Sequence, residues 1–110
     1  MVHKIMCKTA SIPFKVKAQI EDAALSISSN IAEGYSRRTP NENLRFYEIA
    51  LSSAAECYSQ MFALVSSEQI SKDDFDCFDT KIYELENKLI SMNKSLIMNI
   101  RSGAEWKSEY

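Results

Sequence analysis

Residues 71–99 decide the fold class of this chain, and they read SKDDFDCFDTKIYELENKLISMNKSLIMN. Apolar side chains recur in this stretch at alternating spacings of three and four, which is the heptad pattern of a helix that packs along one seam. The residues of the seam are Phe75, Phe78, Ile82, Leu85, Leu89, Met92, Leu96 and Asn99. Ser71–Asp74 is a capping signature, and Ile70 can pack on Phe75 as a hydrophobic staple. The stretch therefore predicts a long helix that begins directly after Ser71.

The segment before it begins with a second start signal. Thr39-Pro40-Asn41-Glu42 places Thr at the N-cap, Pro at the first helical position and Glu at the third, which is a capping box. Two apolar stripes follow, and their combined arc is wider than a single partner helix could cover. One stripe contains Leu44, Tyr47, Leu51, Ala54, Ala55, Tyr58, Met61, Phe62 and Val65, and the other contains Phe46, Ala50, Cys57 and Leu64.

Residues 14–36 predict another helix with two stripes. The first stripe is apolar and contains Val16, Ile20, Ala23, Ala24, Ile27 and Ile31. The second consists mainly of small residues that let a neighbouring helix come close, so we expect packing on more than one side. Its members are Ala18, Asp22, Leu25, Ser29 and Ala32. Before Pro13, the positions of Val2, Ile5 and Met6 predict only two helical turns.

Turn-forming residues are scarce in this chain. It has only two Gly and two Pro among 110 residues, too few for the many turns of a β-sandwich or barrel. We therefore expect an all-α fold, an incomplete bundle of one short first helix and three long helices, and the short first helix together with the wide apolar arc favours a homo-oligomer. Residues 1–103 are expected to form one domain that stops at Ser102–Gly103. Residues 104–110 are expected to be a tail, in which Trp106 is either without a role or an anchor on a neighbouring surface.

Charge and cysteine content narrow the function classes. The formal net charge is −2 and the pI about 5.4, which argues against a dedicated nucleic-acid binder of high pI, although residues 1–38 carry six basic and three acidic side chains. The three cysteines have no C-x-x-C spacing, which is typical of reduced thiols in a cytoplasmic protein. The absence of a long apolar run or a signal-peptide pattern predicts no membrane association.

The sequence predicts no enzyme, metal or cofactor. Its single histidine, His3, cannot complete a zinc set, a di-iron bundle or a convincing triad. The carboxylates of Glu33, Glu48 and Glu56 could gather if the middle helices face each other. We expect them instead to be solvated or to form ion pairs with arginines. The residues expected to be small or flexible core side chains rather than reactive groups are Cys57, Cys77, Met61 and Met92.

The segment around Arg37 and Arg38 is the best candidate binding site. Together with Tyr35 and with Arg45 in the following helix, these arginines could contact phosphates and stack on a base. The alternative interpretation pairs them with Glu33, Glu42 or Glu48, within one protomer or across an interface. One such patch gives little affinity at physiological salt, because it makes only two or three phosphate contacts.

Two motifs resemble a known family. Residues 26–38, SISSNIAEGYSRR, closely resemble the signature S-I-x-x-N-I-A-E-G-x-x-R of bacterial four-helix-bundle proteins encoded in intervening sequences of large-subunit ribosomal RNA genes. Residues 45–56, RFYEIALSSAAE, are similar to the R-F-x-x-I-A-x-G-S-x-x-E stretch of the same family, with Ser52 where the family often has Gly. With the final heptad helix, the resemblance covers roughly residues 14–100.

The resemblance implies an up-down-up-down four-helix bundle that assembles into a ring-like homopentamer. It also implies a relation to the accessory variability protein of diversity-generating retroelements, a basic pentamer that binds nucleic acid. We therefore expect a non-enzymatic oligomeric scaffold or interaction protein, with an RNA- or DNA-binding pentamer as the alternative. Within the first motif, Asn30 and Glu33 are expected to hydrogen-bond across the bundle, with Arg45 or Glu56 as partners, and so to fix its register.

Overall fold

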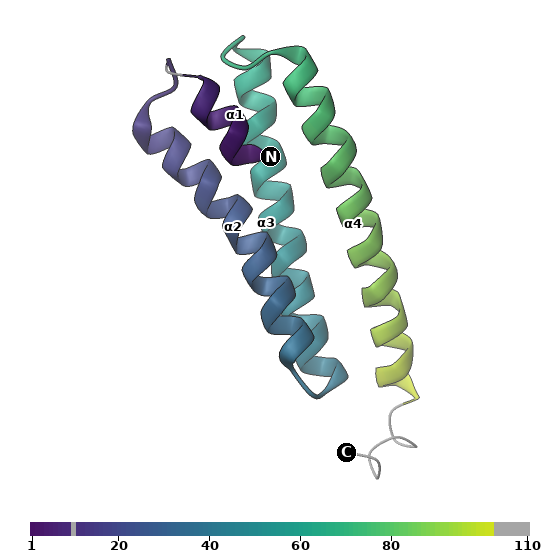
Figure 1. The fold of residues 1–110 in the computed structure, drawn as a ribbon. Helices are drawn as coiled ribbons and strands as arrows, with labels where there is room; N and C mark the ends of the chain where they lie inside the picture. The colour runs from purple at the N-terminus through teal and green to yellow at the C-terminus, as the bar shows by residue number, and fades with distance from the viewer. Residues whose placement is uncertain (10, 103–110) are drawn as a thin grey trace.

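The computed structural model describes residues 1–9 and 11–102, and all regular structure within them is helical. The helices are α1 (Val2–Lys8), α2 (Phe14–Ser36), α3 (Pro40–Ser66) and α4 (Lys72–Arg101). They run alternately up and down (Figure 1), so the all-α class and the bundle order with a short first helix are confirmed. The predicted tail with Trp106 lies outside the described residues.

Both predicted capping signatures are present. The Thr39 Oγ1 accepts a hydrogen bond from the Glu42 backbone N–H at 3.3 Å, and Pro40 occupies the first helical position of α3. The Ser71 Oγ accepts from the Asp74 backbone N–H at 3.1 Å at the start of α4. Each bond satisfies one of the backbone donors that a helix N-terminus leaves without an intrahelical partner. The two helices therefore start where the sequence predicts.

The end of α3 is closed by a motif that the sequence does not reveal. The backbone N–H groups of Glu68 and Gln69 donate to the carbonyls of Val65 and Leu64, at 3.1 and 2.8 Å. This is a Schellman motif, whose left-handed position is usually glycine. Here Glu68 adopts that conformation with φ of 61°. A short loop thus reverses the chain without glycine.

The third helix, α3, is the centre of the fold. It packs against both α2 and α4, while α1 covers one end of α2 (Figure 1). Contact with two helices explains the wide apolar arc of α3, along which Ala50, Ala54, Cys57 and Met61 are completely buried. Most of the core lies at the α1 end, where Ile5, Met6, Ile20, Ile27, Phe75 and Phe78 join α3. A smaller cluster of Tyr47, Ala50 and Leu89 lies farther along the bundle.

The buried seam of α4 departs from the predicted heptad after Leu89. Met92 and Asn99 are exposed, whereas Asn93 is buried and Leu96 is partly buried. A straight α-helix drifts by about 20° per heptad from a strict seven-residue repeat, so a residue next to the expected one turns into the interface. The prediction that Met92 fills the core is therefore wrong, while that for Met61 is confirmed.

Two further core predictions are wrong. The helix α2 contacts both α3 and α1, so packing on more than one side is confirmed, but the second stripe is not the face that packs, since Asp22, Leu25, Ser29 and Ala32 are exposed. Cys77, expected to be buried, is also exposed. It lies between Phe75 and Phe78, both of which face the core, and the helical turn directs the intervening position outward.

The two methionines provide a matched test of this packing. Met61→Ala should lower the free energy of unfolding by about 2–5 kcal/mol, because it leaves a cavity at a fully buried site. Met92→Ala should cost less than about 1 kcal/mol, because that side chain is 40% exposed. Urea denaturation followed by circular dichroism measures both values. Equal losses for the two variants would contradict the observed seam.

Candidate functional site

The turn between α2 and α3 contains the predicted binding residues, and its centre is a close contact between Gly34 and Tyr47. A Cβ atom on Gly34 would lie 2.7 Å from the Tyr47 Cε1 and 3.1 Å from the Phe46 Cβ. Only glycine therefore permits this approach of the two helices. Tyr47 is buried, and its burial, together with the neighbouring Tyr35, raises the pKa of its phenol.

Asn43 holds the two sides of this turn together. Its Nδ2 donates to the carbonyl of Gly34, which lies in the last turn of α2. It also donates at 3.0 Å to the carbonyl of Arg37, which directly follows that helix. The Gly34 carbonyl also accepts from the Arg37 backbone N–H at 3.2 Å, so the Asn43 side chain adds a donor from the next helix at the carbonyls where α2 ends. Asn43 was not among the residues predicted to form a site, although an asparagine directly after a capping box is a signal that could have found it.

Arg37 serves the turn as well. Its Nη2 donates to the Glu33 Oε2 at 3.0 Å, and its guanidinium lies 4.9 Å from the centre of the Phe46 ring. Ionic and cation–π contacts of this kind fix the side chain over the outside of the turn. Of the two interpretations given for Arg37, the structure therefore contains the ion pair with Glu33.

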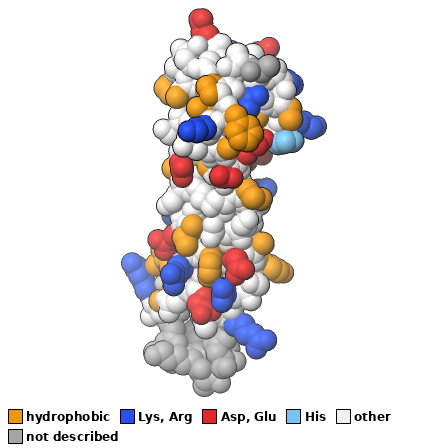
Figure 2. Space-filling view, turned by 90° about the vertical axis from the view of Figure 1, so that its left-hand side faces the viewer, with side chains coloured by type: hydrophobic (Ala, Val, Ile, Leu, Met, Phe, Trp, Pro, Cys, Tyr) orange, Lys and Arg blue, Asp and Glu red, His pale blue; other side chains and the backbone are white. Residues whose placement is uncertain are grey.

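The remaining members of the predicted patch point to solvent. Tyr35 is 83% exposed, and Arg38 and Arg45 are exposed as well. No ion pair involves either arginine within the part of the chain that the structure describes. Figure 2 shows acidic side chains interspersed among the basic ones on this side of the molecule. The patch is therefore small, and its surroundings are of mixed charge.

The predicted polar motif is only partly inside the bundle. Asn30 donates to the Ser26 carbonyl at 2.8 Å and to the Ser26 Oγ at 3.1 Å, and that hydroxyl is 2.8 Å from the Ser53 Oγ on α3. Asn30 thus reaches across the helix pair through Ser26. Glu33 and Glu56 are exposed and lie outside this network, because their helical positions face away from the α2–α3 interface.

The glutamates do not form a catalytic cluster. Glu48 and Glu56 are exposed, and Glu33 pairs with Arg37. Within residues 1–9 and 11–102, no three His, Cys, Asp or Glu side chains gather in a way that could hold a metal ion.

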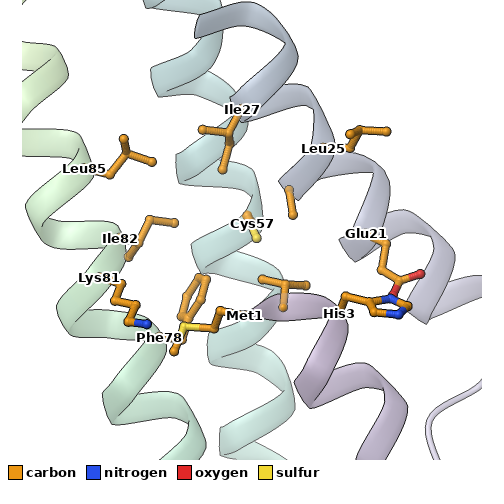
Figure 3. Close-up of a pocket in the computed structure, with 12 residues that line it drawn as sticks. Met1, His3, Glu21, Leu25, Ile27, Cys57, Phe78, Lys81, Ile82 and Leu85 are labelled. Carbon is orange, nitrogen blue, oxygen red and sulfur yellow. The ribbon is translucent and has the colours of Figure 1, made fainter. Parts of the chain in front are cut away.

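A second surface feature is an apolar groove between α2 and α4. It has a volume of about 510 Å³ and is bordered at one end by Met1 and Val2. Figure 3 shows Ile27 on one side, Ile82 and Leu85 on the other, and Cys57 of α3 at its floor. The polar groups at its edge are His3, Glu21 and Lys81. The groove was not predicted from the sequence, because its lining comes from all four helices and depends on how they are placed relative to one another.

Comparison with protein-family profiles shows the family of this chain. The sequence profile of the 23S rRNA-intervening sequence proteins matches residues 2–91, which include α1, α2, α3 and most of α4. The chain belongs to this family. Comparison with curated proteins and with solved structures finds no match.

The turn explains why the family signature reads as it does in this member of the 23S rRNA-intervening sequence proteins. Gly34 is required by the Tyr47 ring, and Arg37 pairs with Glu33 of the same motif. Ser26 and Asn30 connect α2 to α3. These residues stabilise a helical hairpin.

Among the described helices, none is both long and apolar enough to cross a membrane.

Replacement of Gly34 tests the contact at the turn. In an ordinary helix interior, Gly→Ala stabilises by about 0.5–1 kcal/mol. Here Gly34→Ala should instead lower the free energy of unfolding by about 1–3 kcal/mol, because the new methyl group overlaps the Tyr47 ring. In a Tyr47→Ala background the same substitution should cost less, since the overlapping atoms are gone. Thermal denaturation measures all variants. A Gly34→Ala variant that is at least as stable as the parent would refute the contact.

Proposed function

We propose that this chain is a non-enzymatic helical scaffold whose working form is a homopentamer. The observation that supports this most directly is the apolar groove between α2 and α4, which α1 covers at one end only. Leu25 at the groove is 65% exposed, and Leu85 on the opposite side is only partly buried. Apolar surface of this kind gains free energy when a partner helix removes it from water.

A second apolar surface on α4 provides the complementary side. Tyr83, Ile90 and Ile97 are all exposed and recur every seven residues. At 3.6 residues per turn, this stripe lies about 140° around α4 from Leu85 in the groove. A heptad stripe is the pattern by which one helix packs into the groove of another. The stripe of one copy can therefore fill the groove of the next.

Contact between two different surfaces of identical chains favours a ring. Such an interface is heterologous, repeats from copy to copy, and closes when the rotation between copies divides a full turn. Five-fold closure is the expectation that follows from the resemblance of residues 26–38 and 45–56 to proteins that form pentamers.

Static light scattering on three variants tests the assembly. The parent should have the mass of five 12.5 kDa protomers at micromolar concentration. Leu25→Glu in the groove and Ile90→Glu on the stripe should both give monomers, because each buries a carboxylate on one side of the same interface. Phe14→Glu is the matched control, since Phe14 is 82% exposed but belongs to neither surface. It should keep the parent's mass.

The outcomes separate assembly from folding. All three positions are exposed in the protomer, so the helical circular dichroism signal should be retained in every variant. A parent that is monomeric at micromolar concentration would contradict the proposal. Loss of assembly in Phe14→Glu, with Leu25→Glu unaffected, would place the interface elsewhere.

A nucleic-acid-binding pentamer is the second candidate function. It is supported by the exposed Tyr35, Arg38 and Arg45 at the α2–α3 end of the bundle. One copy offers few phosphate contacts, whereas five copies in a ring would bind one RNA strand through several patches at once. Aromatic stacking on Tyr35 would add sequence-tolerant affinity.

Salt-dependent binding of a single-stranded RNA oligonucleotide tests this candidate. Fluorescence anisotropy should detect binding at about 50 mM salt that weakens steeply as salt rises. The double variant Arg38→Glu/Arg45→Glu should abolish it. Lys15→Glu/Lys72→Glu makes the same change of charge at the opposite end of the bundle and should bind nearly as the parent does. Equal losses in both double variants would show that only net charge matters, and absence of binding by the parent would exclude the candidate.

A further inference from the structure

Three side chains on the outer surface of α1 and α2 form a hydrogen-bonded row, and two of them, His3 and Glu21, also border the groove between α2 and α4. The His3 Nδ1 lies 2.6 Å from the Glu21 Oε1, and the His3 Nε2 lies 3.4 Å from the Cys7 Sγ. His3 and Cys7 are four residues apart on α1, so they share one face of that helix. Glu21 comes from α2, and Figure 3 shows it meeting the His3 ring at the edge of the groove.

The order of the row determines the direction of proton transfer. An ionised carboxylate can only accept, so the His3 Nδ1 carries the hydrogen that Glu21 accepts. In the neutral imidazole the other ring nitrogen, Nε2, is then an acceptor, and it lies 3.4 Å from the Cys7 Sγ. This is the arrangement of a nucleophile, a base and a group that orients the base. Because Glu21 and Cys7 contact opposite nitrogens of one ring, they cannot share a metal ion through it.

We propose that Cys7 is an activated surface thiol that forms mixed disulfides with low-molecular-weight disulfides, with His3 as its base and Glu21 as the positioning residue for His3. Cys7 and His3 are exposed, so a small reagent can reach the sulfur. Two lysines, Lys4 and Lys8, lie on α1 together with Cys7. Lys8 also donates to Asp74 of α4 at 3.2 Å, which ties α1 to the bundle.

The reaction proceeds by thiol–disulfide exchange. His3 Nε2 takes the proton of Cys7, and the thiolate attacks one sulfur of the disulfide. A bond forms between Cys7 Sγ and that sulfur as the S–S bond of the reagent breaks. The released thiolate takes the proton back from His3. One disulfide is exchanged for another, and no further oxidant is needed.

The other two cysteines are internal controls. Cys57 is buried, and its burial, reinforced by Glu56, raises the pKa of its thiol to about 11. It should react only when the fold opens. Cys77 is exposed like Cys7, but the chain's single histidine, His3, already faces Cys7. If exposure alone decided the reaction rate, Cys7 and Cys77 would react equally fast, so a faster Cys7 reports the effect of His3.

Mass spectrometry of the full chain treated with hydroxyethyl disulfide at neutral pH gives a rate for each cysteine. Cys7 should react at least about tenfold faster than Cys77, which is below the roughly 10²–10⁴-fold that a positioned base typically contributes, because this site is exposed to water. His3→Gln should remove this advantage and leave the Cys77 rate unchanged. Added imidazole should restore part of the Cys7 rate in His3→Ala without affecting Cys77.

A double-mutant cycle separates positioning by Glu21 from a structural effect. Glu21→Gln should slow Cys7 in the parent but have no effect in the His3→Gln background, because Glu21 acts only through His3. Cys57 should stay unlabelled in all variants, which reports an intact fold. Equal rates for Cys7 and Cys77 in the parent, or a His3→Gln variant that reacts as fast as the parent, would overturn the proposal.

Discussion

The packing of α2 and α4 on the same central helix is the constraint on which the rest of this fold depends. Ala50, Ala54 and Cys57 of α3 are small and completely buried, so neighbouring backbones can approach closely. Because both outer helices take α3 as their main neighbour, their remaining apolar edges flank a groove instead of closing on each other. The short α1 fills one end of it. The incomplete burial of the protomer is thus a direct consequence of its central helix, and it is the physical basis for expecting a second copy.

The α2–α3 turn shows how a conspicuous motif can be mainly structural. Gly34 makes room for the Tyr47 ring, Asn43 satisfies the carbonyls at the end of α2, and Arg37 pairs with Glu33 over Phe46. Each of these contacts has the same effect, which is to set the angle at which α3 leaves α2. The arginine of the signature, Arg37, therefore has a structural role that needs no nucleic acid. Of the predicted patch's arginines, Arg38 and Arg45 remain exposed and available for a partner.

The helices were predictable because their signals are local. Thr39 and Ser71 cap the helices that follow them, and both act through backbone donors only three residues away. Burial was harder to predict where geometry depends on a neighbour. Met92 and Cys77 lie in apolar patterns, yet both are exposed, because the drift of a straight helix and the position of α3 decide which side is covered. The polar motif divides in the same way, since Asn30 joins the interface while Glu33 and Glu56 face outward.

The amino-acid sequence by itself determined the all-α class, the start of each long helix and the membership of residues 2–91 in an intervening-sequence protein family. These properties follow from periodicity, capping and motif order, which act over a few residues. Only the tertiary structure decided what lies side by side. It opened the groove between α2 and α4, and it placed Glu21 of α2 against His3, which faces Cys7. Such contacts join residues far apart in the chain, and their geometry depends on how whole helices pack.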